Sequence, residues 1–168
     1  MAFLSDEQII QLLEECDKSK AKDLSIIVKI ALSTGARWSE AEGLTSSQVT
    51  PYKITFTKIK GKRNRTVPIS KVLYDEIPKK RGALFTPCYS AFRMAMKRTG
   101  IELPHRQSSH VLRHTFASHF MMNGGNILVL QRILGHTDIK MTMRYSHFSP
   151  EHLEDAVKFN PLSNNYEK

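Results

Sequence analysis

The chain of 168 residues carries 25 Lys and Arg residues against 16 Asp and Glu residues, so its formal net charge is +9. Hydrophobic residues make up 40% of the chain and charged residues 24%, which are the proportions of a folded globular domain and exclude wholesale disorder. Two cysteines, Cys16 and Cys88, are too few for a disulfide framework, and the longest apolar stretch, residues 25–32, is too short to span a membrane. We therefore expect a reduced, cytoplasmic domain with no membrane association, whose excess positive charge favours nucleic acid as its partner.

The N-terminal part of the chain is predicted to be helical. Ser5 and Gln8 form a capping-box pattern ahead of apolar residues at helical spacing, so a helix should begin there. A second helix is expected over residues 23–34, where an apolar stripe is followed by Gly35 as a stop signal. A short helix is expected over residues 39–44.

The pattern then changes to that of β-strands. Residues 53–57 alternate between apolar and polar side chains, and residues 66–69 are similarly rich in β-forming residues. The segment between them contains Gly61 and Asn64, which predicts a β-hairpin with a turn. This turn region is strongly basic and contains Lys58, Lys60, Lys62, Arg63 and Arg65.

The remainder of the chain is again predicted to be helical. Helices are expected over residues 70–77, 90–98, 110–122, 127–134, 139–145 and 150–159, and a polar tail follows. Ser108 or Ser109 is expected to cap the helix that begins at His110, and Gly100 to end the helix before it. The predicted fold class is therefore mainly α with a small antiparallel β-sheet or hairpin (α+β).

Two fragments of the sequence are suited to binding a phosphate. His110 and Arg113 share one face near the start of a helix, where free N–H groups and the helix dipole favour an anion. Arg37 would add a second guanidinium, and Glu40 a carboxylate that holds this arginine in place. Each fragment alone is also typical of a solvated helix face or a structural ion pair, so neither establishes a function.

A specific order of motifs runs along almost the whole chain: Thr34-Gly-Ala-Arg37, Lys60, His110-x-x-Arg113, Leu134-Gly-His136 and Tyr145. This order resembles the catalytic domain of the tyrosine recombinases, the phage integrase family. The resemblance extends over residues 3–148, and the C-terminal segment is similar to that of integrases from P2-like temperate phages. It implies the catalytic-domain fold of that family and an enzyme of DNA recombination and DNA integration.

The resemblance also implies a role for each residue of the motifs. Tyr145 would attack a DNA phosphorus and form a 3′-phosphotyrosyl bond, releasing a 5′-hydroxyl. Because the phosphotyrosine conserves the bond energy, neither a metal nor a nucleotide cofactor would be required. Arg37 and Arg113 would hold the scissile phosphate, His110 would assist proton transfer, and His136 would donate a hydrogen bond to the phosphate.

The basic hairpin would serve the same reaction. Lys60 matches the family lysine that protonates the leaving 5′-oxygen, while Lys58 and Lys62 stand close enough in the sequence to remain alternatives. Four basic residues of this region are expected to contact DNA: Lys58, Lys62, Arg63 and Arg65.

Two other classes of function were weighed against this hypothesis. His110 and His114 are four residues apart, which suits metal ligands, but Val111 stands where a His-Glu-x-x-His motif requires glutamate. Within the resemblance, His114 and His119 are interpreted as packed or structural residues. The alternative is a non-catalytic DNA-binding regulator, because the short helices around Leu134-Gly-His136 can mimic a helix-turn-helix; such a protein would never form a covalent bond through Tyr145.

The predicted organisation places a tyrosine recombinase catalytic domain in residues 1–149 and a C-terminal helix and tail in residues 150–168. Integrases carry DNA-binding domains before the catalytic domain, and this chain is expected to lack them. The expected partners are double-stranded DNA and further copies of the chain, as a dimer and as a tetramer on paired sites. The expected location is the cytoplasm of a bacterial host, in association with the nucleoid.

Overall fold

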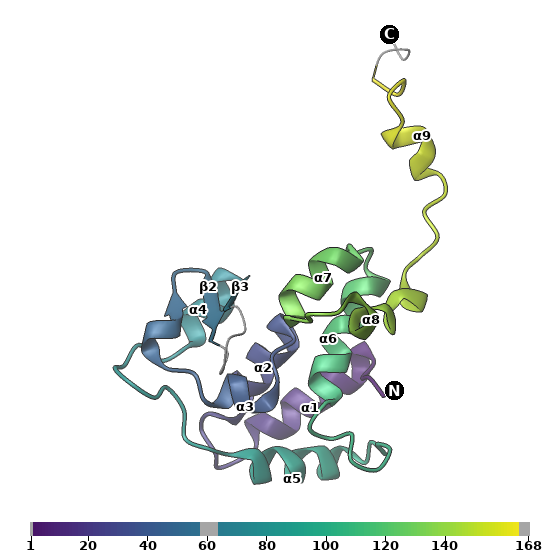
Figure 1. Cartoon of the computed structure of the whole chain (residues 1–168). Helices are drawn as coiled ribbons and strands as arrows, with labels where there is room; N and C mark the ends of the chain where they lie inside the picture. Colours follow the sequence, from purple (N-terminus) through teal and green to yellow (C-terminus); the bar gives the residue numbers. More distant parts are fainter. Residues whose placement is uncertain (1, 58–63, 165–168) are drawn as a thin grey trace.

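The computed structural model describes residues 2–57 and 64–164 (Figure 1). The elements in chain order are α1 (Asp6–Asp17), α2 (Leu24–Thr34), α3 (Trp38–Glu42), η1 (Ser46–Gln48), β1 (Val49–Thr50), β2 (Lys53–Phe56), β3 (Arg65–Pro68), α4 (Lys71–Glu76), α5 (Tyr89–Thr99), α6 (Val111–Met122), α7 (Ile127–Leu134), α8 (Ile139–Met143), η2 (Ser146–Phe148) and α9 (Asp155–Phe159). The predicted class, mainly α with a small antiparallel sheet, is confirmed. Within the described residues, no helix has the length and apolar character that crossing a membrane would demand.

Helix α2 lies at the centre of the helical part and packs against α1, α3 and α6. Its sequence is apolar on nearly every side, and Ile27, Ile30 and Ala31 are fully buried. A helix with so wide an apolar surface has to be surrounded by other elements. The helix ends at Gly35, whose φ of 71° is the left-handed conformation that terminates helices, as the sequence predicted.

The predicted hairpin is present, with β2 and β3 antiparallel and Ile54 opposite Val67. Ile54, Phe56 and Val67 face the core, so this register buries one side of the ribbon. A third strand, β1, pairs with the other edge of β2 and was not predicted, because its two residues are too short to show an alternating pattern.

Two details of the helices differ from the sequence predictions. Helix α6 begins after His110, and neither Ser108 nor Ser109 caps it; the His110 amide instead bonds to the Gln107 carbonyl in a preceding turn. Helix α8 ends at Met143, so Tyr145 lies in a turn, with its amide bonded to the Thr142 carbonyl at 3.0 Å.

The C-terminal segment, residues 150–164, extends away from the rest of the protein (Figure 1). Only Asp155–Phe159 within it is helical, rather than the predicted residues 150–159. Four large apolar side chains of this segment are exposed: Leu153 by 81%, Val157 by 68%, Phe159 by 79% and Leu162 by 56%. Within the described part of the chain, no element covers the apolar side chains of this short helix, which explains why so little of the expected helix forms.

Candidate active site

The C-terminal ends of two helices meet at Arg113. Its guanidinium donates to the carbonyl of Gly35, just after α2, at 2.9 Å, and to the carbonyl of Leu134, the last residue of α7, at 2.7 Å. Carbonyl groups at a helix end lack partners inside the helix and carry partial negative charge, so they bind a cation well. Burial, and then the charges of Arg37 and Arg65, lower the pKa of Arg113 to about 10, and the side chain therefore stays charged at neutral pH.

His136 lies against this arginine. Its Nε2 is 3.2 Å from a terminal nitrogen of Arg113, and its Nδ1 is 2.7 Å from the hydroxyl of Thr142. Because a guanidinium can only donate, Nε2 accepts this bond and Nδ1 carries the proton that is donated to Thr142. Thr142 is fully buried, so it fixes the orientation of the imidazole ring.

Glu40 joins two of the predicted site arginines. Its carboxylate accepts two hydrogen bonds from Arg65, at 2.7 and 2.9 Å, and one from the backbone amide of Arg37 at 2.9 Å. Burial alone would raise the pKa of Glu40, but the hydrogen bonds from Arg65 and Arg37, with their charges, hold it at about 2. The Arg37 side chain remains 44% exposed, with its Nη1 3.7 Å from Glu40. Arg37 is thus anchored through its backbone, while its guanidinium can reach a ligand.

The structure corrects the prediction that Arg65 contacts DNA. The Arg65 side chain is only 6% exposed and stacks over the ring of Phe56 at 4.8 Å. Its Nε donates to the carbonyl of Ile133 at 2.8 Å, and both terminal nitrogens bind Glu40. Arg65 therefore ties β3 to α3 and α7 instead of facing a polyanion.

Tyr145 is 1% exposed and packs in a small apolar cluster with Ala117, Met121 and Leu134. Its hydroxyl lies 2.7 Å from Nδ1 of His114, the residue that follows Arg113 on α6. The sequence favoured a structural role for His114, and no local pattern indicated this contact, because Tyr145 lies 31 positions further along the chain.

The environment keeps the His114–Tyr145 pair neutral. Burial raises the pKa of Tyr145, although the charges of Arg144 and Arg113 oppose this effect. Burial, together with the nearby charge of Arg144, lowers the pKa of His114 to about 4. The imidazole is consequently uncharged at neutral pH.

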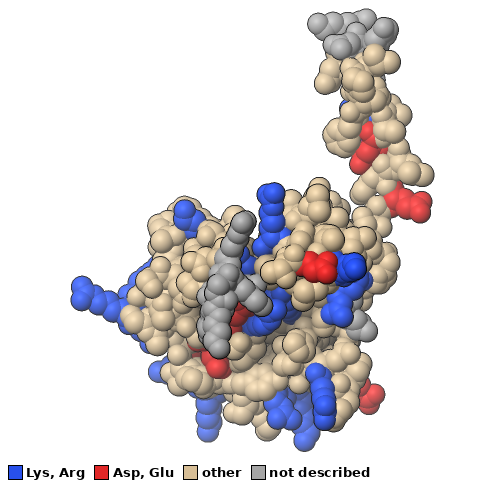
Figure 2. Space-filling view, viewed as in Figure 1, with Lys and Arg blue, Asp and Glu red and all other residues tan. Residues whose placement is uncertain are grey.

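Of the remaining predicted residues, the structure describes only His110. His110 is exposed at the start of α6, and its ring centroid is 6.0 Å from that of His114. Lys58, Lys60, Lys62 and Arg63 lie outside the described residues. Basic side chains recur across the face shown in Figure 2, including its centre, and acidic side chains are fewer there.

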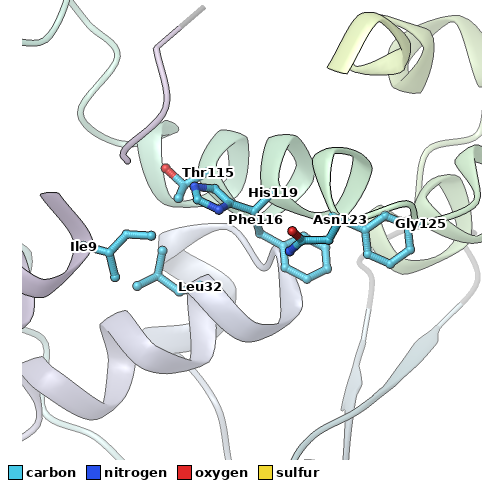
Figure 3. Close-up of a pocket in the computed structure, with 8 residues that line it drawn as sticks. Ile9, Leu32, Thr115, Phe116, His119, Asn123 and Gly125 are labelled. Atoms are coloured by element: carbon cyan, nitrogen blue, oxygen red, sulfur yellow. The ribbon is translucent and has the colours of Figure 1, made fainter. Parts of the chain in front are cut away.

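A cavity of about 460 Å³ lies elsewhere, between α1, α2 and α6 (Figure 3). Ile9, Leu32, Phe116 and Phe120 make most of its lining apolar. His119 also lines it and donates from Nε2 to the Leu4 carbonyl at 2.7 Å, which agrees with its interpretation as a structural residue. Among the described residues, none of those predicted to be catalytic lines this cavity.

Comparisons with known proteins agree on one family. The sequence matches the phage integrase family over residues 2–81 and 86–152. The integrase of Escherichia phage 186 is 68% identical over 163 residues, which are 96% of this chain and 48% of that protein. The chain thus spans about half the length of the curated relatives it matches.

Solved structures give the same result. The catalytic domain of the bacteriophage HP1 integrase superposes with a TM-score of 0.94 at 67% identity, covering 98% of each chain. The Tn1549 transposon integrase, solved in complex with circular intermediate DNA, has a TM-score of 0.69 at 22% identity and covers 92% of this chain and 64% of that one. The second likeness concerns the fold alone.

Proposed function

Because the chain belongs to the phage integrase family, we propose that it is the catalytic part of a site-specific DNA recombinase that cleaves and rejoins DNA through a bond between Tyr145 and a 3′-phosphate. The observation that carries this proposal is the position of Arg113. Its buried charge is fixed by two helix ends and lies against His136, while the next residue on the same helix holds the Tyr145 hydroxyl. A fixed cation next to a tyrosine suits a reaction in which a phosphodiester gains negative charge.

The phosphate would be bound by Arg113 and Arg37. A guanidinium has five N–H donors, so Arg113 can hold the Gly35 and Leu134 carbonyls and still donate to a phosphate oxygen. Arg37 reaches the same region from α3, because Glu40 fixes its backbone and leaves its side chain exposed. His136, held by Thr142, would complete the binding of the phosphate after its Nε2 turns from Arg113 or takes up a proton.

The reaction needs one proton removed and one supplied. Attack by Tyr145 releases the phenol proton, and the departing 5′-oxygen takes a proton from a general acid. We assign the acid to Lys60, on the motif order of the sequence, with Lys58 and Lys62 as neighbours that could replace it. His110 would assist proton transfer from the exposed start of α6. The reverse reaction, attack of a partner strand's 5′-hydroxyl on the phosphotyrosine, rejoins DNA.

Double-stranded DNA is the proposed substrate and partner. The net charge of +9 supports a polyanionic ligand, and the related Tn1549 integrase was solved in complex with DNA. Lys58, Lys62 and Arg63 are proposed to contact its backbone. The site of action would be the nucleoid in the cytoplasm of a bacterial host.

Self-association is proposed to occur through the C-terminal segment. Leu153, Val157 and Phe159 expose apolar surface on an extension that projects from the rest of the described structure. Exposed apolar groups of this kind gain free energy by packing on another molecule. We propose a dimer that forms in this way, and a tetramer on paired DNA sites.

The experiment that tests the function incubates the chain with supercoiled plasmid in excess EDTA and then adds SDS. We expect relaxed plasmid and an SDS-resistant protein–DNA adduct. Tyr145→Phe should give neither, while its affinity for DNA stays close to that of the wild type. An adduct that forms as fast with Tyr145→Phe would contradict the proposal.

A further inference from the structure

An imidazole lies against the Tyr145 hydroxyl, on which Arg144 also acts through a side-chain hydrogen bond. His114 Nδ1 lies 2.7 Å from the hydroxyl oxygen, which is a short and well-formed hydrogen bond. Both rings are shielded from water, since Tyr145 is 1% exposed and His114 is half-buried. Among the described residues, no hydrogen bond joins His110 to Tyr145 at all, although the sequence assigned proton transfer to His110.

The direction of this bond follows from the charge state of the pair. With burial lowering the pKa of His114 to about 4, its ring carries a single proton at neutral pH. Burial also raises the pKa of Tyr145, so the phenol keeps its own proton. With both partners neutral, the imidazole can carry its proton on Nε2, and in that tautomer the hydroxyl donates to Nδ1.

We propose that His114 is a catalytic residue that accepts the proton of Tyr145 as the tyrosine attacks the phosphodiester. The proposal rests on the function proposed above, because it concerns the same attack. In this step the O–H bond of Tyr145 breaks while an Nδ1–H bond forms on His114. The phenol oxygen bonds to phosphorus, the bond from phosphorus to the 5′-oxygen breaks, and the general acid protonates that oxygen. His114 becomes an imidazolium and returns its proton to the phenol when the strand is rejoined.

The substrate itself makes His114 a better base. After burial, the causes that lower its pKa include the positive charges of Arg144 and Arg113. A DNA phosphate bound beside Arg113 brings negative charge next to these cations and offsets their effect on the imidazole. The proton acceptor is thus weak in the free protein, where the phenol should stay protonated, and stronger when DNA is bound.

The kinetic test compares the rate of covalent adduct formation in single-turnover conditions for the wild type and His114→Asn. The asparagine oxygen lies close to the position of Nδ1 and can accept the same hydrogen bond, but it cannot take up a proton. We expect adduct formation to slow by about 10²-fold or more, the usual contribution of a general base, with unchanged affinity for DNA. His119→Asn, on the same helix and outside the site, is the matched control and should keep the wild-type rate.

A second variant guards against a merely structural effect. His114→Ala should regain adduct formation in proportion to added imidazole, since free imidazole can occupy the vacated space and take the proton. His114→Asn with the wild-type rate, or a faster one, would overturn the proposal, and the faster rate would mean that His114 only restrains the tyrosine. Failure of the proposed function looks different. In that case the wild type would form no adduct, or Tyr145→Phe would form one as fast as the wild type.

The geometry can also be measured without DNA and without a variant of His114. Nitrogen NMR of the wild-type histidine rings at neutral pH should show one ring with its proton on Nε2 and an Nδ1 shift that changes in Tyr145→Phe. A ring in contact with Tyr145 that carries its proton on Nδ1 would overturn the proposal, because such a nitrogen cannot accept the phenol proton.

Discussion

Arg113 derives its position from carbonyl oxygens that belong to two different helices. A planar guanidinium can bind the Gly35 and Leu134 carbonyls at the same time, while a lysine ammonium is a point charge on a flexible stem. We expect Arg113→Lys to retain the positive charge and still slow adduct formation by about 10²-fold, as the loss of an oxyanion donor does. Single-turnover cleavage of a suicide substrate measures this. A lysine variant within a factor of a few of the wild type would show that charge alone suffices.

Glu40 should contribute to the free energy of unfolding as well as to the position of Arg37 in the site. Glu40→Gln leaves the buried Arg65 without its anionic partner, and breaking such a pair costs about 3 kcal/mol. The exposed pair Lys29–Glu76 is the matched control, and Glu76→Gln should change the free energy of unfolding by less than about 1 kcal/mol. Urea denaturation of both variants at neutral pH checks these values.

The effect of Glu40→Gln should also depend on pH in a defined window. The carboxyl has a pKa of 4.5 when unfolded and about 2 in the folded protein, so its contribution is fully present above about pH 4.5 and is lost as the pH falls toward 2. The difference in unfolding free energy between wild type and Glu40→Gln should therefore shrink across this range. A difference that stays constant from pH 5 to about 2 would refute the assigned ion pair.

At the residue level, the sequence predicted those site members whose chemistry is visible in the motif order. Arg113 contacts His136, the charge of Arg37 acts on Arg113, and Tyr145 lies beside the residue that follows Arg113, while the catalytic roles of these residues stay predictions. The contact of His114 could not be predicted, because it depends on where the turn after α8 places a side chain 31 positions away. The burial of Arg65 was equally hidden, since its partners come from α3 and α7.

At the level of elements, the C-terminal end of α2 contributes both to the packing of the fold and to the position of Arg113. A Cβ atom on Gly35 would lie 2.6 Å from Phe116 Cδ1 and 2.7 Å from Leu134 Cδ2. The backbone of Gly35 has a φ of +71°, which is unfavourable for a residue with a side chain. Gly35→Ala should therefore destabilise the protein by about 2 kcal/mol or more and also displace the carbonyl that holds Arg113.

Gly100 provides the matched control for this prediction. It ends α5 with a φ of +72°, and a Cβ atom there would meet nothing within 4 Å. Gly100→Ala should cost only the conformational part, about 1 kcal/mol, and leave adduct formation unchanged. Thermal unfolding of both variants tests the pair, and equal losses of stability would contradict the close packing around Gly35.

Most elements could be predicted because their signals are local. The capping box at Ser5, the stop at Gly100 and the alternation along the strands each depend on only a few neighbouring residues. Each of these features is present in the structure. The prediction of a helix over residues 150–159 was wrong in its extent, since a periodic apolar pattern forms a stable helix only when something covers its apolar face.

At the scale of the whole molecule, the C-terminal segment should determine the oligomeric state. Its side chains Leu153, Val157 and Phe159 are exposed among the residues that the structure describes. We expect the full chain to sediment as a dimer at tens of micromolar, and a chain cut after Ser149 to sediment as a monomer. Equal monomeric masses for the two proteins would contradict the proposed role of the segment.

The central claim is that Tyr145 forms the covalent bond to DNA, and one measurement tests it most directly. The adduct formed with DNA in EDTA is digested with protease and nuclease, and mass spectrometry then locates the residue that carries the remaining nucleotide. We predict a nucleotide on Tyr145 and on no other tyrosine. A nucleotide on Tyr166, on Tyr89 or on a serine would contradict the account.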